Sequence, residues 1–274
     1  MLQSMDTASI LFAAGFGSRM KGFTGNKTLL PLVPGRDPYT GDWPILSEIV
    51  RNLPKGPKAL VVHHRKEQVI EATRELGIVY CDQPIPNGTG GALIATQGFM
   101  GGIDERNLII TMGDVPFVEA VTYGNLVRQL SYHDLVVLGF KPETKARYGV
   151  LEVENEAVKR IIEWRYWNEF PPEIQRGFEI CNSGIYAAKR SILLEYISLL
   201  KEKPHRVEKE RGGKMVVVEE YFITDLIEMM NSDGLRVGFT IAEHEQEVMG
   251  IDTREDLVLA QRIFAKRKRQ VKRF

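Results

Sequence analysis

The stretch Leu11–Leu32, LFAAGFGSRMKGFTGNKTLLPL, decides the fold of this chain. An apolar segment there runs into a glycine-rich turn, Gly15 to Arg19, and Lys27 follows. Glycine tolerates positive φ and close backbone approach, so several N–H groups of such a turn can converge on one anion. We predict a strand leading into a phosphate-binding loop, with Arg19 and Lys27 adding positive charge. The alternative is a tight strand-to-helix turn with two surface cations.

The loop differs from two common nucleotide-binding patterns. No glycine directly precedes Lys27, as a Walker A loop requires, and Met20 stands where the dinucleotide pattern G-x-G-x-x-G ends in glycine. The loop therefore predicts an anion site of another kind.

Short apolar runs alternate with segments of helical period along the first two thirds of the chain. The predicted strands are Ser9–Ala14, Ala59–His63, Ile78–Cys81, Asn107–Met112, Leu135–Phe140 and Ile180–Ala187, and helical segments include Glu67–Leu76 and Gly91–Phe99. This alternation predicts an α/β fold, with a Rossmann-like, mostly parallel sheet flanked by helices on both faces. Ligands of such sheets bind at the carboxyl ends of the strands.

From about residue 148 the pattern changes to strand pairs. Gly149–Val153, Ala157–Glu163 and later Arg236–Glu243 predict a smaller antiparallel lobe that closes a cleft against the sheet. We expect one domain over 1–252, with halves at about 1–147 and 148–252, followed by a basic helix over 253–274 that Asp252 or Thr253 caps. Loops are predicted at Val33–Pro44 and Pro204–Lys214.

The composition limits the class of protein. The 274 residues are 43% hydrophobic, which is ample for a core, and 36 basic residues balance 36 acidic ones. No apolar run approaches the roughly 18 residues of a membrane span, and no signal peptide pattern opens the chain. Two distant cysteines indicate a reducing compartment. We expect a cytoplasmic protein that binds neither nucleic acid nor membrane, and we interpret the basic C-terminal tail as a solvated helix end.

Two carboxylates have a predicted place in the cleft. Asp114 directly follows the strand pattern of Asn107–Met112 and Gly113, where a carboxylate can bind Mg²⁺ through oxygen; a turn or helix-cap carboxylate is the alternative. Asp252 precedes the last helix, where metal binding and helix capping are equally well supported by the local sequence.

Three further residues are candidates for ligand contacts. The amide of Gln83 suits the edge of a pyrimidine, and Gly88 permits a base to approach the backbone, although Gln83 alone also fits a polar residue that opens a loop. Asn182 stands within the apolar segment FEICNSGIYAA, so its amide is expected to be partly buried and to need partners.

The first loop resembles a family signature. Gly15-x-Gly17-Ser18-Arg19-Met20 followed by Lys27 is similar to G-x-G-T-R-M…P-K of sugar-1-phosphate nucleotidyltransferases. Further elements follow in the family's order: Gln83…Gly88-Thr89, Gly113-Asp114-Val115-Pro116, Tyr148-Gly149, Ile162-Glu163, Glu179…Asn182-Ser183-Gly184-Ile185-Tyr186, Tyr221-Phe222-Ile223-Thr224-Asp225 and Gly250-Ile251-Asp252. The series covers nearly the whole chain and resembles most the uridylyltransferase domain of the bacterial N-acetylglucosamine-1-phosphate uridylyltransferases.

The resemblance implies a role for each matching position. Arg19, Lys27 and Asp114 would be catalytic; Ala13, Ala14, Gly15, Gly17, Ser18, Gln83, Gly88 and Thr89 would bind the nucleotide; Gly149, Glu163, Asn182 and Thr224 would surround the sugar; and Asp114 and Asp252 would hold Mg²⁺.

The implied reaction is attack of a sugar 1-phosphate on the α-phosphorus of UTP, which gives a UDP-sugar and pyrophosphate. N-acetylglucosamine 1-phosphate is the expected sugar and a homo-oligomer is possible. The alternatives are thymidylyl transfer from dTTP, another nucleoside triphosphate, or a catalytically silent protein that binds nucleotide sugars.

The chain departs from the family pattern at several positions. One extra residue separates Arg19 from Lys27, and Asn26 replaces the customary proline, so the reach of Lys27 into the site is in question. Asp252 replaces an asparagine and adds a negative charge to the expected metal site. The hexapeptide repeats of an acetyltransferase domain are not found, so we expect no acetyl transfer.

Overall fold

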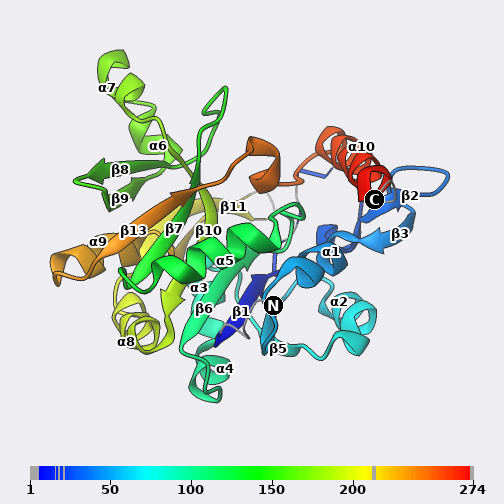
Figure 1. The fold of residues 1–274 in the computed structure, drawn as a ribbon, viewed down its shortest axis with the longest axis horizontal. Coiled ribbons are helices and arrows are strands. Elements are labelled where there is room, and N and C mark those ends of the chain that lie inside the picture. The colour runs from blue at the N-terminus through cyan, green and yellow to red at the C-terminus, as the bar shows by residue number, and fades with distance from the viewer. Residues whose placement is uncertain (1–5, 16, 18, 21, 212–213, 272–274) are drawn as a thin grey trace.

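The computed structural model describes residues 6–15, 17, 19–20, 22–211 and 214–271. A nine-stranded mixed sheet forms its centre (Figure 1). Seven strands follow in the order β13 (Val237–Ile241), β7 (Leu135–Phe140), β10 (Cys181–Lys189), β6 (Asn107–Met112), β1 (Thr7–Phe12), β4 (Lys58–Val62) and β5 (Val79–Asp82). Only β10 in this row runs antiparallel to its neighbours. The predicted mostly parallel α/β sheet is confirmed.

Helices cover both faces of the sheet because its strands are apolar on both sides. Ile10 and Leu11, adjacent on β1, are fully buried in two separate apolar clusters. One face packs against α1 (Ile45–Asn52), α2 (Lys66–Thr73), α5 (Ala120–Gln129) and α10 (Arg254–Val271). The other packs against α3 (Gly88–Ala95), α4 (Gln97–Gly101), α8 (Arg190–Leu200) and α9 (Asp225–Ser232).

Short elements complete the fold. They are the 3₁₀ turns η1 (Lys27–Leu29), η2 (Arg74–Leu76) and η3 (Glu245–Val248), the helices α6 (Trp164–Trp167) and α7 (Pro172–Gly177), and the hairpin of β8 (Val150–Glu154) and β9 (Ala157–Ile162). That hairpin pairs with the start of β10 through Val150 and Cys181, so it joins the sheet near one edge. Among the described residues, no helix has the length and apolar character needed to cross a membrane.

The topology brings distant segments to one edge of the sheet. The carboxyl ends of β1, β4, β5, β6, β7 and β13 meet there because these strands run in one direction. The antiparallel β10 starts at the same edge, where Asn182 lies opposite Gly139 near the end of β7. Candidate residues that follow parallel strands therefore face those at the start of β10.

Three predicted segments differ from the structure. Val237–Ile241, placed by the sequence in the antiparallel lobe, is an edge strand parallel to β7, because its apolar residues extend the sheet. Pro204–Lys214, predicted as a loop, contains β11 (His205–Arg211), which pairs with β12 (Lys214–Glu220). The many charged residues of β11 gave no apolar alternation from which a strand could be predicted. The predicted loop at 33–44 contains parts of a second hairpin, β2 (Pro31–Pro34) and β3 (Gly41–Pro44).

Candidate active site

Four charged side chains from three distant parts of the chain form one cluster. The Lys27 ammonium donates to Asp252 Oδ1 over 2.8 Å and also contacts the Asp114 carboxylate. Arg19 contacts the other carboxylate oxygen of Asp252. The structure thus brings together all three predicted catalytic residues and both predicted metal ligands. Two carboxylates that share one ammonium are close enough to share one divalent cation.

Thr253, and not Asp252, caps the last helix. The Thr253 hydroxyl accepts from the Asp256 N–H, and the Asp256 carboxylate accepts in return from the Thr253 N–H over 2.8 Å, as in a capping box. The carboxylate of Asp252 is therefore free to contact Lys27 and Arg19. The adjacent Ile251 N–H donates to the Asp114 carbonyl over 3.0 Å, which ties the two carboxylate-bearing segments together.

Asn26 positions Lys27. It is 1% exposed and its amide donates to two carbonyls that follow neighbouring strands, Ala13 after β1 and His64 after β4. Its oxygen accepts from the N–H of Thr28 and thereby caps the turn that carries Lys27. The extra residue in the loop has not displaced Lys27. In the sequence, Asn26 was noted only as a departure from the family pattern. An asparagine directly before a short helical turn is a common cap, and this role was not predicted.

The cluster balances its own charges. Burial by itself would lower the pKa of Lys27, but the charges of Asp114 and Asp252 outweigh burial and raise it. Burial likewise opposes ionisation of Asp252, yet Lys27 and Arg19 hold its pKa below the usual range. Lys27 and Asp252 are therefore charged at neutral pH, and the formal charges of the two basic and two acidic side chains cancel. The cluster offers no net positive charge to a polyphosphate.

The carboxylates fit a magnesium ion. Mg²⁺ prefers oxygen ligands and is commonly held by one or two carboxylates together with water and substrate phosphates. Asp114 and Asp252 supply two such oxygens at one point, with partly exposed side chains that leave room for further ligands. Among the described residues no cluster of three or more acidic, histidine or cysteine side chains was found that would suit a metal held by protein alone.

The remaining residues predicted at the phosphate loop lie beside this cluster. Ala13 is buried and its carbonyl accepts from Asn26. Gly17 has φ of +60°, which favours glycine at this turn, and it lies beside the side chain of Lys27. Ala14 is buried and Gly15 exposed. Ser18 lies outside the described residues.

The predicted base-binding residues form a second group. Gln83 is 4% exposed, and its amide donates to Asn87 Oδ1 over 3.0 Å and to the Gly88 carbonyl over 3.2 Å. A β-carbon at Gly88, whose φ is +92°, would lie 2.4 Å from the Tyr221 carbonyl oxygen. The glycine is therefore required by packing against Tyr221 and not only by the approach of a ligand. The sequence did not indicate the contribution of Asn87.

The four predicted sugar-binding residues come together around the start of β10. The Asn182 N–H donates to the Gly149 carbonyl over 2.8 Å, while its side chain donates to the buried Tyr186 hydroxyl over 2.9 Å. The Thr224 hydroxyl donates to Glu163 Oε1 over 3.3 Å rather than capping α9. Burial raises the pKa of Glu163. Asn182 is half-buried and partnered, as predicted from its sequence context.

The segment 221–224 connects the predicted base-binding residues with the predicted sugar-binding residues. The Tyr221 N–H donates to the Asn87 carbonyl over 2.9 Å, and the Ile223 N–H donates to Thr89 Oγ1 over 3.2 Å. The Thr224 hydroxyl donates to Glu163, which belongs to the predicted sugar-binding residues. One short segment therefore links both sets of residues.

We expect Asn26→Ala to destabilise the protein by about 2–4 kcal/mol, because it removes a helix cap and leaves two buried carbonyls without a partner. Chemical denaturation measures this loss. Asn168→Ala, at an exposed asparagine, is the control and should change stability by less than about 0.5 kcal/mol. Equal stability of the two variants would contradict the role of Asn26.

We expect Glu163→Gln to become more stable than the parent as pH rises from about 4.5 towards neutrality. The folded pKa of Glu163 is raised above its usual 4.5, so the unfolded chain loses this proton first and ionisation favours unfolding. The difference should reach roughly 1.4 kcal/mol for each unit by which the pKa is raised. Denaturation at several pH values measures it, with Glu169→Gln, at an exposed carboxylate, as control. A pH-independent difference would contradict the prediction.

Comparisons with known proteins identify the family of the chain. Residues 9–170, more than half of the chain, match the MobA-like NTP transferase domain. The bifunctional protein GlmU of Ruegeria sp. (strain TM1040) is 29% identical over 271 residues, covering 95% of this chain and 53% of that protein. GlmU of Paracoccus denitrificans (strain Pd 1222) is 30% identical over 269 residues, covering 96% and 53%. The chain thus spans about half the length of these curated relatives.

A solved structure shares the fold. The uridine diphosphate N-acetylglucosamine pyrophosphorylase from Trypanosoma brucei superimposes with a TM-score of 0.72 at 13% identity, over 94% of this chain and 65% of that one. The resemblance drawn from the motifs is confirmed by these relatives. The chain belongs to the MobA-like NTP transferase domain family and is a nucleotidyltransferase of that family.

Proposed function

We propose that the protein transfers a uridylyl group from UTP to a sugar 1-phosphate in the presence of Mg²⁺ and releases pyrophosphate. The observation that carries this proposal is the contact of one ammonium, that of Lys27, with the carboxylates of both Asp114 and Asp252. This contact supports the proposal because it brings an ammonium and two carboxylates, the kind of oxygen ligand that Mg²⁺ prefers, to the sheet edge where the predicted base-binding and sugar-binding residues also lie. The relatives named GlmU and pyrophosphorylase support the same reaction class.

The proposed chemistry needs charge stabilisation more than proton transfer. The attacking phosphate oxygen of the sugar is already anionic, so it forms its bond to the α-phosphorus without a general base while the bond to pyrophosphate breaks. Lys27 stabilises charge at the α-phosphate, and Arg19 with the loop amides holds the departing pyrophosphate. Asp114 and Asp252 would hold Mg²⁺, which would supply the positive charge that the cluster lacks.

Uracil is the base we propose. The side-chain amide of Gln83 has the donors and acceptor that suit the edge of a pyrimidine, and its bonds to Asn87 and Gly88 hold it beside the predicted base-binding segment. Thymine offers the same edge, so dTTP is the nearest competing substrate.

N-acetylglucosamine 1-phosphate is the proposed sugar. Glu163, Thr224 and Asn182 gather polar atoms around the glycine at 149, where small bulk leaves space beside the Glu163 carboxylate. The altered spacing before Lys27 was a reason to expect a catalytically silent protein. Lys27 nevertheless contacts both carboxylates of the cluster, which favours an enzyme.

Pyrophosphate release tests the proposal directly. The protein is incubated with Mg²⁺, one of UTP, dTTP, CTP, GTP or ATP, and one of several sugar 1-phosphates. We expect the highest kcat/KM with UTP and N-acetylglucosamine 1-phosphate, and no release without Mg²⁺. Turnover confined to a purine nucleotide or CTP would overturn the assignment of uracil as the base. Binding of a UDP-sugar without any turnover would overturn the proposal that the protein is an enzyme.

Lys27→Ala should lower kcat by roughly 10² or more if Lys27 is a preorganised donor to the reacting phosphate. Lys58→Ala is the matched control, because Lys58 begins β4 and therefore lies at the opposite edge of the sheet. Steady-state kinetics compare both variants with the parent. A kcat for Lys27→Ala within about threefold of the parent would refute the assigned role.

A further inference from the structure

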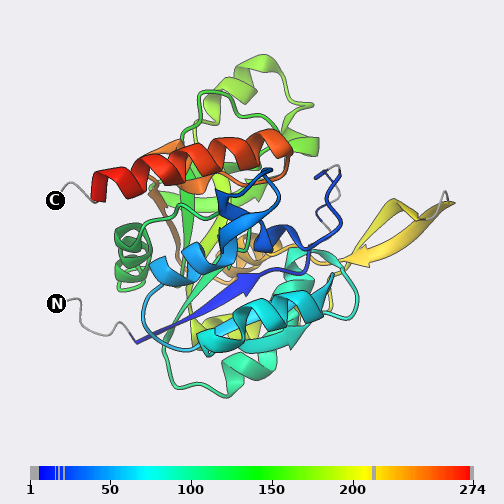
Figure 2. The same ribbon diagram turned by 90° about the vertical axis from the view of Figure 1, so that its right-hand side faces the viewer.

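β10 begins at the sheet edge that carries the candidate site, and its pairing with β7 is irregular there. Figure 2 shows this edge: β1, in blue, points towards the side from which the hairpin of β11 and β12 projects. Asn182 lies opposite Gly139 of β7. Ile185 lies opposite the next residue of β7, Leu138, so two residues of β10 bulge out of the pairing. Bulges are frequent next to active sites, where they redirect a side chain.

The side chain of Ser183 holds this bulge in place. Its hydroxyl donates to the Leu138 carbonyl of β7 over 2.6 Å and accepts from the Ile185 N–H of β10 over 3.2 Å. The hydroxyl thus bonds to both strands at the point where their pairing is interrupted. The position of the bulge is therefore fixed by hydrogen bonds.

The bulge brings Asn182 and Tyr186 into contact. In a regular strand, residues four apart are separated by about 13 Å, because each residue advances the strand by about 3.3 Å. Here the two residues that face them on β7 are Gly139 and Val137, which are only two positions apart. Asn182 and Tyr186 therefore lie on one face of the sheet as near neighbours, and the Asn182 amide donates to the Tyr186 hydroxyl over 2.9 Å.

Tyr186 is a rigid support for this amide. It is 1% exposed and is one of the largest fully buried side chains, so its ring cannot change position without disturbing the core. Burial raises the pKa of Tyr186. The hydroxyl therefore stays protonated at neutral pH and offers the Asn182 amide a neutral acceptor.

Two contacts fix the direction in which the Asn182 amide faces. The Gly184 N–H donates to Oδ1 of Asn182 over 3.0 Å, so the oxygen must lie on that side and the nitrogen on the side of Tyr186. Together these contacts use one N–H and one lone pair of the amide. One N–H and one lone pair remain, and Asn182 is only half-buried, so a ligand can reach them.

We propose that Tyr186 is a positioning residue that holds the Asn182 amide in the orientation in which it binds the sugar 1-phosphate. This assignment rests on the proposed function, because it takes Asn182 as a contact of the sugar. Tyr186 acts from within the core and through Asn182 alone. Its loss should therefore weaken binding of the sugar 1-phosphate and leave binding of UTP as it is.

Steady-state kinetics of Tyr186→Phe test the assignment. The change removes only the hydroxyl, so the ring still fills its place in the core. We expect KM for the preferred sugar 1-phosphate to rise roughly 3–10-fold, as for the loss of one neutral hydrogen bond, while kcat and KM for UTP change less than about twofold. An unchanged KM for the sugar 1-phosphate, or an equal rise in KM for both substrates, would overturn the assignment.

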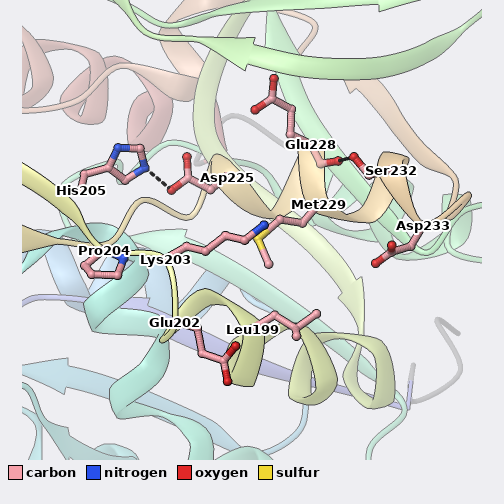
Figure 3. A pocket seen from close by; sticks show the side chains of 10 residues that line it. All are labelled: Leu199, Glu202, Lys203, Pro204, His205, Asp225, Glu228, Met229, Ser232 and Asp233. Atoms are coloured by element: carbon pink, nitrogen blue, oxygen red, sulfur yellow. Dashed lines mark hydrogen bonds and ion pairs between the residues drawn. The ribbon is translucent and has the colours of Figure 1, made fainter.

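Tyr196→Phe is the matched control. Tyr196 is 3% exposed and its hydroxyl donates to Asp233 Oδ2 over 2.6 Å, so this change also removes one hydrogen bond of a buried tyrosine. Figure 3 shows Asp233 on the wall of a pocket of about 670 Å³, and it follows α9 at the end away from Thr224. Thermal unfolding verifies that both variants are folded. We expect Tyr196→Phe to leave both KM values unchanged, and a rise in KM equal to that of Tyr186→Phe would overturn the assignment.

A double-mutant cycle shows whether Tyr186 acts through Asn182. Asn182→Ala should raise KM for the sugar 1-phosphate, and adding Tyr186→Phe to it should raise this KM less than about twofold further, because the amide that Tyr186 holds is then absent. Effects of the two changes that multiply in full would overturn the assignment alone. A parent protein that turns over no sugar 1-phosphate would overturn the proposed function and this assignment together.

Discussion

The ammonium of Lys27 between two carboxylates is the interaction on which the rest of the site depends. Without it, Asp114 and Asp252 would repel each other across a partly buried space. With it, and with Arg19, the formal charges of the cluster cancel, and Lys27 and Asp252 stay charged although burial opposes both charges. This balance explains why the site can be assembled before any ligand arrives. Because the protein uses its own positive charges to hold its carboxylates, the reaction that we propose includes an additional cation.

The scaffold supplies that cluster through ordinary features of an α/β sheet. Parallel strands bring Ala13, Asp114 and His64 to one edge, and Asn26 binds the carbonyls of two of these segments while it caps the turn that presents Lys27. Thr253 takes the capping role at the last helix and leaves Asp252 for the cleft. Each contribution is one or two hydrogen bonds, but together they fix groups that are more than two hundred residues apart.

Asp252 is a departure from the family signature within the cluster. An acidic residue where that signature has asparagine changes the formal charge of the cluster from one net positive charge to none. The hairpin of β11 and β12 ends just before the segment 221–224, which bonds to Asn87 beside the predicted base-binding residues and to Glu163 among the predicted sugar-binding residues.

The sequence by itself determined the strands β6 and β7 to the residue, the mostly parallel sheet and the order of the motifs, because apolar periodicity and glycine turns are local properties. It also identified Lys27, Asp114 and Asp252 as candidates. Only the tertiary structure decided that Thr253 is the cap, that Asn26 positions Lys27, that Gly88 packs against Tyr221 and that Val237–Ile241 belongs to the main sheet. The Thr253 cap is a local contact with Asp256, but the other outcomes depend on which distant backbone groups meet, and a hydrogen bond between distant segments leaves no periodic trace in the chain.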